Sequence, residues 1–166
     1  MSLASQPQLA TAQTLEYAVK ANYLYKFAPF VEWPPRTFPS ATSPFNVCVL
    51  GEAPFGDALE EATQGQRIGE HPIAVHRLTA ATSATGCHVA YIGRSNTTKE
   101  TLDALRGHPV LTVTDSDHGV KGGVVHFVLQ RGRVRFAIDT RAARAQGLTI
   151  SSKLLGLAIN ARQGGD

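Results

Sequence analysis

The chain contains 166 residues, of which 43% are hydrophobic and 17% are charged, and its formal net charge is +3 at pH 7. This length and composition predict a single globular domain with a sizeable core. The small basic excess gives no reason to expect nucleic-acid binding, which requires a clustered basic face. No apolar run approaches the ~18 residues that a membrane-spanning helix needs.

The first segment, residues 1–13, is rich in Ala, Ser, Gln and Thr and carries no charge. Segments of this kind at a chain end are commonly disordered. We therefore expect residues 1–13 to be a disordered tail or an expression leader. The folded domain is expected to occupy residues 14–162.

Residues 15–35 hold half of the aromatic side chains of the chain, namely Tyr17, Tyr23, Tyr25, Phe27, Phe30 and Trp33. Apolar residues recur here at steps of three or four, which predicts an amphipathic helix with one aromatic stripe. The stripe comprises Leu15, Val19, Tyr23, Phe27 and either Phe30 or Val31. Pro29 predicts a kink or an early end, and the helix should stop before Trp33, because two prolines follow. We expect the stripe to pack on a sheet as core. The alternative is that part of it faces a partner protein.

The middle of the chain alternates strands with helices. Short apolar runs predict strands at residues 45–50, 73–78, 88–92 and 110–114. One helix is expected between the first two strands, beginning at Pro54 and stopping near Gly65. A second helix follows residue 96, where Thr97 and Glu100 have the spacing of a capping box and Gly107 marks the end.

The last third of the chain predicts antiparallel strands and two short helices. Residues 124–130 and 133–139 are separated by Arg131-Gly132, the spacing of a two-residue hairpin. Asp139 or Thr140 can cap a short helix, and Ser151 or Ser152 can cap a last one. The predicted fold is therefore α/β: a single domain with a mixed, mostly parallel sheet, a C-terminal antiparallel hairpin and helices on both faces.

The densest basic cluster lies on this hairpin and comprises Arg131, Arg133 and Arg135. On a strand the three arginines would share one face, because side chains alternate. A solvated strand face is the simplest interpretation of this pattern. A binding surface for an acidic partner is the alternative.

The two cysteines, Cys48 and Cys87, have no metal-ligand or redox-motif spacing. Cys48 lies within a predicted strand and Cys87 just before another, so the ends of adjacent strands could bring them together. They are either two separate buried thiols or one disulfide formed in an oxidising compartment.

No motif in the chain predicts catalysis. The turn from Gly51 to Gly56 lacks the end of a phosphate-binding loop, and Asp115 and Asp117 are not followed by the rest of a calcium loop. The histidines are scattered, so we expect no metal site and no cofactor. An obvious nucleophile is also missing, and we expect the protein not to be an enzyme.

Six segments together resemble the YfiR-like family in order and spacing. They are KANYLYKFAPFVEWP, FNVCVLGEAPFGDALE, CHVAYIG, HPVLTVTD, GGVVHFVLQRGRVRFAID and AARAQGLTISSKLLGLA. The resemblance implies a bacterial periplasmic protein with a mixed α/β fold, usually a homodimer. A signal peptide preceding such a chain would already have been removed. The disulfide of the family falls on Cys48 and Cys87, which implies that these two residues are paired.

The resemblance also implies a function. In the best-known member, the protein represses an inner-membrane diguanylate cyclase through the periplasmic domain of the cyclase, and an outer-membrane lipoprotein relieves the repression. We therefore expect a regulator of cyclic di-GMP signalling that binds partner proteins. Our hypothesis for the binding surface is the exposed part of Tyr23, Tyr25, Phe30, Val31, Glu32 and Trp33. The alternatives are a small-ligand sensor, with an apolar pocket between the first helix and the sheet, and an enzyme on a flavodoxin-like scaffold.

Overall fold

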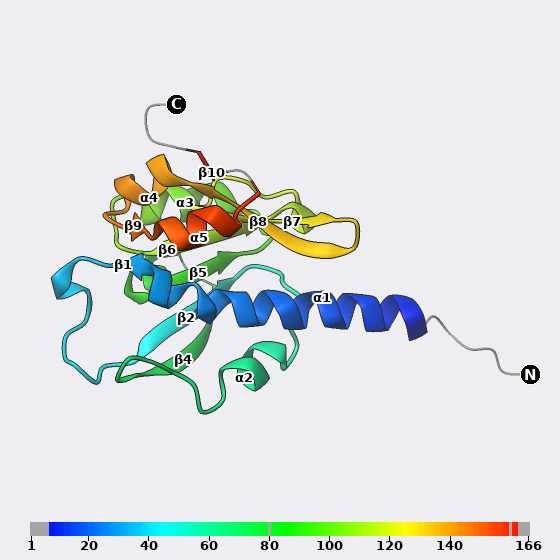
Figure 1. The fold of residues 1–166 in the computed structure, drawn as a ribbon, viewed down its shortest axis with the longest axis horizontal. Coiled ribbons are helices and arrows are strands. Elements are labelled where there is room, and N and C mark those ends of the chain that lie inside the picture. The colour runs from blue at the N-terminus through cyan, green and yellow to red at the C-terminus, as the bar shows by residue number, and fades with distance from the viewer. Residues whose placement is uncertain (1–6, 80, 160, 163–166) are drawn as a thin grey trace, which may run out of the picture.

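A computed structural model describes residues 7–79, 81–159 and 161–162 of the chain. A long helix precedes an alternation of strands and helices, and a hairpin and two short helices follow (Figure 1). The α-helices are α1 (Pro7–Lys26), α2 (Ala58–Thr63), α3 (Thr98–Leu105), α4 (Thr140–Ala145) and α5 (Ser152–Leu157). The strands are β1 (Val31–Glu32), β2 (Phe45–Leu50), β3 (Arg67–Ile68), β4 (His71–Leu78), β5 (Val89–Ile92), β6 (Leu111–Asp115), β7 (Val125–Gln130), β8 (Arg133–Asp139), β9 (Thr149–Ile150) and β10 (Ala161–Arg162).

The main sheet has the strand order β10-β8-β7-β6-β5-β2-β4-β3. Strands β4, β2, β5, β6 and β7 run parallel to their neighbours, while β8 is antiparallel to β7 and β3 is antiparallel to β4. In chain order the parallel strands read 2-1-3-4-5, the order of flavodoxin-like sheets. The predicted mixed, mostly parallel sheet is confirmed. The antiparallel pair at the other edge, β3 with β4, was not predicted.

Helices cover both faces of the sheet, as predicted. On one face, α1 and α2 pack on Val47, Val49 and Tyr91. On the other, α3 and the 3-10 turn Ala81–Gly86 pack on Cys48, Leu50 and their neighbours. A separate two-stranded sheet joins β1 to β9, so the residues after α1 pair with residues near the C-terminus.

Helix α1 differs from its prediction in where it begins and in which stripe it buries. It begins at Pro7, inside the segment expected to be disordered, and residues 1–6 lie outside the described residues. The buried stripe consists of Tyr17, Lys20, Ala21 and Leu24, and Ala28 of the following 3-10 turn continues it. Leu15 and Val19 are 64% and 37% exposed, so the predicted stripe is wrong in its first half. An apolar count missed the observed stripe because that stripe contains a lysine.

Of the three N-terminal helix caps predicted from the sequence, two form. Asp139 caps α4 by accepting hydrogen bonds from the backbone amides of Arg141 and Ala142. Ser151 caps α5 through the amide of Lys153. The capping box predicted for α3 does not form, because the side chain of Thr97 accepts no hydrogen bond from a backbone amide of the helix. As predicted from Pro29, α1 ends early, at Lys26, and a 3-10 turn at Ala28–Phe30 follows.

Candidate functional site

The aromatic residues in the last turn of α1 and just after the helix lie mostly in the core. Tyr25 and Val31 are 8% and 7% exposed, so neither offers more than an edge to a partner. The ring of Tyr23 is half-buried, stacks on Phe27 at 5.6 Å and meets Phe136 of β8 edge-on at 5.5 Å. This part of the hypothetical binding surface therefore fastens α1 to the hairpin.

Trp33 and its neighbours on the chain leave more surface free. The indole of Trp33 donates a hydrogen bond to the carbonyl of Pro109 at 3.1 Å and is half-buried. Phe30 is half-buried as well, and Glu32 is exposed. The six candidate residues therefore differ in exposure: Tyr25 and Val31 are buried, and accessible surface is left on the other four, Tyr23, Phe30, Glu32 and Trp33. Partner binding by this segment stays a prediction.

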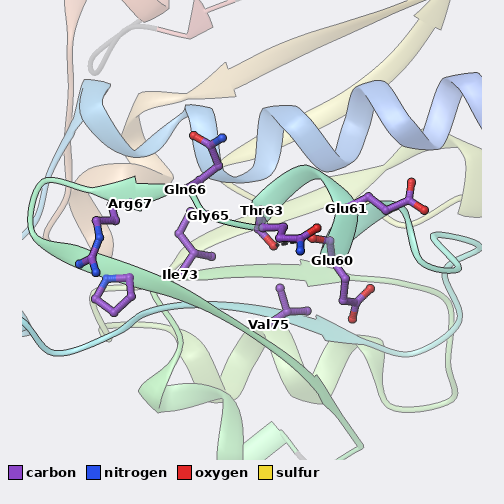
Figure 2. Close-up of a pocket in the computed structure, with 10 residues that line it drawn as sticks. Glu60, Glu61, Thr63, Gly65, Gln66, Arg67, Ile73 and Val75 are labelled. Atoms are coloured by element: carbon purple, nitrogen blue, oxygen red, sulfur yellow. Dashed lines mark hydrogen bonds between the residues drawn. The ribbon is translucent and has the colours of Figure 1, made fainter.

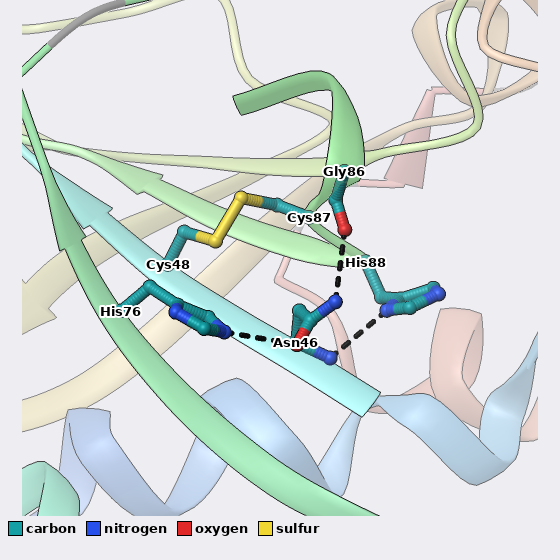
Figure 3. Close-up of a disulfide and its surroundings, with 6 residues drawn as sticks. All are labelled: Asn46, Cys48, His76, Gly86, Cys87 and His88. Carbon is teal, nitrogen blue, oxygen red and sulfur yellow. Dashed lines mark hydrogen bonds between the residues drawn. A yellow bond between two sulfur atoms is a disulfide. The ribbon is translucent and has the colours of Figure 1, made fainter. Parts of the chain in front are cut away.

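The disulfide between Cys48 and Cys87 confirms the pairing implied by the family resemblance (Figure 3). It joins β2 to the residues just before β5, and Asn46 of β2 makes three hydrogen bonds nearby, two to the chain before β5 and one to His76 of β4. The backbone amide of Asn46 donates to Nδ1 of His88, its side-chain amide donates to the carbonyl of Gly86, and its Oδ1 lies 2.9 Å from Nε2 of His76. These contacts fix the entry to β5 around the disulfide.

His88 is the most perturbed histidine of this region. Its ring packs against Phe38 at 4.4 Å and against Phe45 at 5.0 Å, and the residue is 5% exposed. Burial lowers the pKa of His88 to about 4, because the charged ring would lose its hydration. With Nδ1 accepting from Asn46, His88 is a neutral structural residue near neutral pH.

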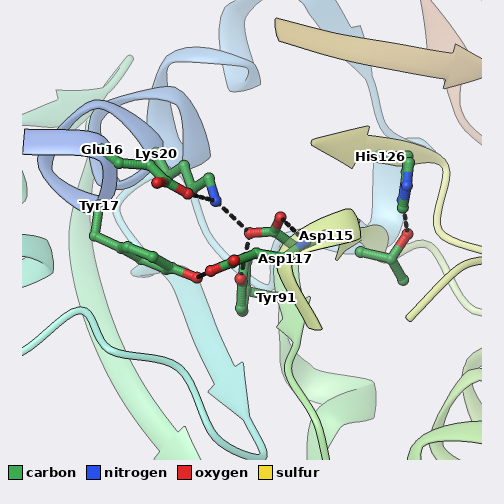
Figure 4. A network of polar contacts seen from close by, with 8 residues as sticks. Glu16, Tyr17, Lys20, Tyr91, Asp115, Asp117 and His126 are labelled. Atoms are coloured by element: carbon green, nitrogen blue, oxygen red, sulfur yellow. Dashed lines mark hydrogen bonds and ion pairs between the residues drawn. The ribbon is translucent and has the colours of Figure 1, made fainter. Parts of the chain in front are cut away.

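A buried ionic network ties α1 to the end of β6 (Figure 4). Nζ of Lys20 lies 2.8 Å from Oδ2 of Asp115 and 2.5 Å from Oε2 of Glu16. The hydroxyl of Tyr91 donates to Asp115 at 2.6 Å, and that of Tyr17 donates to Asp117 at 2.7 Å. Buried charges are tolerated only when their remaining hydrogen-bonding capacity is met in this way.

Both tyrosines of the network are hydrogen-bond donors, not acids. Burial raises the pKa of Tyr17 well above its usual range, and its hydrogen bond to Asp117 raises it further. Burial and the adjacent charge of Asp115 likewise raise the pKa of Tyr91. Neither phenol would lose its proton at neutral pH, so both hydroxyls act as donors that help to hold α1 in place.

Surface hollows occur in several places, and the one lined by Asn46, Gly86, Cys87 and His88 coincides with the disulfide junction. One hollow of about 610 Å³ lies between α2 and the β3–β4 pair, with Ile73 and Val75 at its floor and Glu60 and Glu61 at its rim (Figure 2). Glu60 is paired with Arg77, and hydrogen bonding to that guanidinium lowers the pKa of the carboxyl group. The small-ligand alternative placed its pocket elsewhere, between α1 and the sheet. That interface is filled by Leu24, Phe27 and Phe127.

The position where flavodoxin-like sheets bind their ligands has a surface hollow of about 550 Å³, and backbone contacts join two of the loops that line it. Ligands in such folds sit outside the carboxyl ends of the strands where the strand order reverses, here between β2 and β5. The amide of Glu52 donates to the carbonyl of Arg94 at 2.9 Å, and that of Gly93 donates to Leu50 at 2.7 Å. A Cβ atom on Gly93 would lie 2.1 Å from the carbonyl oxygen of Glu52. Gly93 therefore allows the close backbone contact between the two loops.

The basic cluster on the hairpin is exposed and divided between the turn and a strand. Arg131 and Gly132 both have positive φ angles, of 52° and 76°, which is the geometry of a type I′ hairpin turn. The prediction that all three arginines share a strand face is wrong for Arg131, which lies in the turn between β7 and β8. The three arginines instead surround a hollow beside Gln130.

Residues 17–159 match the family model described as YfiR/HmsC-like. The chain belongs to this family. The matched range begins at Tyr17, in the ionic network, and ends at Ile159, which hydrogen-bonds to β8. It therefore contains the disulfide, the ionic network and the hairpin. No match was found among curated proteins.

The YfiR/HmsC-like family is a regulatory, non-catalytic family of periplasmic proteins. Within the part of the chain that the structure describes, no cluster of His, Cys, Asp and Glu has the arrangement of a metal site. No helix among the described residues combines the length and hydrophobicity needed to cross a bilayer.

The residues that sequence reasoning missed are Lys20 and its partner Asp115. The available signal was the alternative stripe of Tyr17, Ala21, Leu24 and Ala28, which has the same spacing as the predicted one.

Proposed function

We propose that this YfiR/HmsC-like protein binds the periplasmic domain of an inner-membrane diguanylate cyclase and represses the cyclase, which lowers cyclic di-GMP. The observation that carries the proposal is the family match over residues 17–159, nearly the whole described fold. Family membership supports a periplasmic regulator of diguanylate cyclase signalling in general, and the binding of a cyclase is our extension of it.

The chemistry of the polar residues supports a binding protein over a catalyst. The buried titratable groups have structural partners: Lys20 pairs with Asp115, and His88 accepts from Asn46. The disulfide suits an oxidising compartment such as the periplasm. The residues left to bind a partner are on the surface, notably Phe30, Glu32 and Trp33 and the arginines of the hairpin.

The proposal includes two further partners implied by the family. An outer-membrane lipoprotein would relieve the repression by sequestering the regulator from the cyclase. A second copy of the chain would form a homodimer. Each of these predicts a complex that can be detected separately with purified components.

The decisive experiment measures binding and signalling together. The purified protein would be titrated against the periplasmic domains of the diguanylate cyclases encoded in the same genome, with calorimetry as the readout. In parallel, cellular cyclic di-GMP would be measured after deletion and re-expression of the gene. We expect saturable binding to one of these domains, and higher cyclic di-GMP in the deletion strain than in the complemented one. Unchanged cyclic di-GMP together with an absence of binding would refute the proposal.

A further inference from the structure

The outer edge of β8 is only partly covered. Strand β10 pairs in parallel with Ile138 and Asp139 at the far end of β8. One step nearer the hairpin tip, the amide of Ile159 donates to the carbonyl of Phe136 at 2.9 Å. Among the residues that the structure describes, pairing along this edge stops at Phe136, and residues 133–135 continue toward the tip. Figure 1 shows this part of the hairpin projecting beyond the rest of the sheet.

The backbone of Val134 points toward this open edge. Successive residues of a strand direct their amide and carbonyl groups to alternate sides. Phe136 lies opposite Phe127 of β7, yet its carbonyl bonds outward to Ile159. Val134 is two residues earlier and opposite Leu129, so its amide and carbonyl point outward as well. A donor and an acceptor are thus presented with the spacing of a strand ladder.

The side chains beside this edge differ between the two faces of the sheet. Arg133 and Arg135 are exposed on one face of the sheet, and neither takes part in an ion pair with the described residues. Val134 lies on the other face next to Leu129, which is 51% exposed. The sequence between Val125 and Ile138 contains no acidic residue. One face of the edge is therefore basic and the other apolar.

We propose that the edge of β8 at Arg133–Arg135 is a docking site for an extended segment of a partner protein, in which carboxylates alternate with apolar side chains. Such a segment would add a strand to the sheet by hydrogen bonds to Val134. Its carboxylates would lie across from the two arginines, and its apolar side chains would extend the surface of Val134 and Leu129. The same arginines disfavour a second copy at this edge, because two such edges would bring like charges together.

This inference deepens the proposed function by giving the chemistry of the partner, and it rests on that function for its biological role. Charged side chains on a free edge also prevent aggregation, and a purely protective role is the competing explanation. The test uses a synthetic peptide, Glu-Val-Glu-Val-Glu-Val with blocked ends, and its lysine counterpart Lys-Val-Lys-Val-Lys-Val. Because no cyclase is present, a failure here is distinct from a failure of cyclase binding.

The readouts are backbone amide chemical shifts and hydrogen exchange of the full chain during peptide titration. We expect the acidic peptide to shift the amides of residues 133–136 and to slow exchange at Val134, while the lysine peptide leaves both unchanged. The double variant Arg133→Glu/Arg135→Glu should bind the acidic peptide at least ~10-fold more weakly, a change of about 1.4 kcal/mol. It should also gain binding of the lysine peptide.

Two variants separate strand addition from simple charge attraction. Val134→Pro removes the outward amide but keeps both arginines, and a proline is tolerated where the amide faces solvent. We expect it to abolish binding of the acidic peptide while circular dichroism stays unchanged. The control Arg141→Glu/Arg144→Glu makes the same charge change on exposed positions of α4 and should bind as the wild type does. The proposal fails if the acidic peptide does not bind, if slowed exchange at Val134 is absent, or if the control loses binding as well.

Discussion

Nζ of Lys20 lies 2.8 Å from Oδ2 of Asp115, and each side chain is 1% exposed. This pair connects the one long helix that precedes the sheet to the end of a central strand. Removing one partner from a buried ion pair leaves an uncompensated charge, whereas removing both does not. The two residues can therefore be tested against each other.

The first prediction concerns this pair. Lys20→Met should lower the free energy of unfolding by about 3–5 kcal/mol, because the carboxylate of Asp115 stays buried without its cation. The double variant Lys20→Met/Asp115→Asn should be more stable than the single one, since Tyr91 can still donate to the amide oxygen. Urea unfolding measures both. Lys99→Met is the control, because Lys99 is 87% exposed in its pair with Asp103, and its change should stay within about 1 kcal/mol. Equal losses for Lys20→Met and the double variant would contradict the argument.

The second prediction concerns the disulfide. Cys48 and Cys87 are 39 residues apart in the sequence, and opening a loop of this size should cost roughly 4 kcal/mol in the chain-entropy account. Unfolding in the presence of dithiothreitol should therefore occur at a lower urea concentration than without it. The double variant Cys48→Ala/Cys87→Ala should show no such dependence. Thiol titration under denaturing conditions checks the starting state, and two free thiols in protein purified from the periplasm would contradict the pairing.

The third prediction concerns pH and His88. Burial lowers the pKa of His88 to about 4 in the folded protein, whereas an unfolded histidine titrates near 6.5. The unfolded chain therefore takes up this proton first as pH falls. The contribution of His88 to stability is complete above pH ~6.5 and is lost progressively as pH falls toward 4, to a total of about 3 kcal/mol.

The variant His88→Gln isolates this contribution from those of the carboxyl groups. It should reduce the slope of unfolding free energy against pH between about pH 6.5 and 4. His108→Gln changes an exposed histidine and should leave the slope as it is in the wild type. If the wild type and His88→Gln show the same slope, burial of a neutral His88 is not what links stability to pH.

The fourth prediction concerns the contact between the loops after β2 and β5. A Cβ atom on Gly93 would lie 2.1 Å from the carbonyl oxygen of Glu52, so Gly93→Ala must push the two loops apart. Overpacking of this kind costs about 1–3 kcal/mol. Gly86→Ala is the matched control, because a Cβ there meets nothing within 4 Å. Thermal unfolding should separate the two variants, and equal melting temperatures would show that the contact is unimportant.

The elements that sequence reasoning predicted well are those specified by local chemistry. The apolar runs of β2, β5 and β6, the type I′ spacing at Arg131-Gly132 and the cap at Asp139 each depend on residues that lie close together in the sequence. Helix α1 shows where such reasoning stops. Two stripes with the same spacing compete along it, and the buried one contains Lys20, whose partner Asp115 is distant in the sequence. Hydrophobicity alone could not choose between these stripes.

The candidate binding surfaces also combine features that local sequence predicts with features that depend on distant residues. Composition and spacing identified the arginines of the hairpin and the aromatic segment. They could not show that Tyr25 and Val31 are covered, or that the edge of β8 is open beside Val134. Both facts depend on which distant strands and helices lie next to these residues. The two-residue strand β3 was missed because its pairing with β4 follows from a tight turn and not from an apolar pattern.

The short pairing of β1 with β9 has a consequence for the order of events during synthesis and export. Val31 lies opposite Ile150, and Tyr17 donates to Asp117, a residue 100 positions later. The N-terminal helix therefore cannot complete its native contacts until nearly the whole chain has emerged. In a protein of a periplasmic family, this order leaves the leading helix without its native partners during most of synthesis.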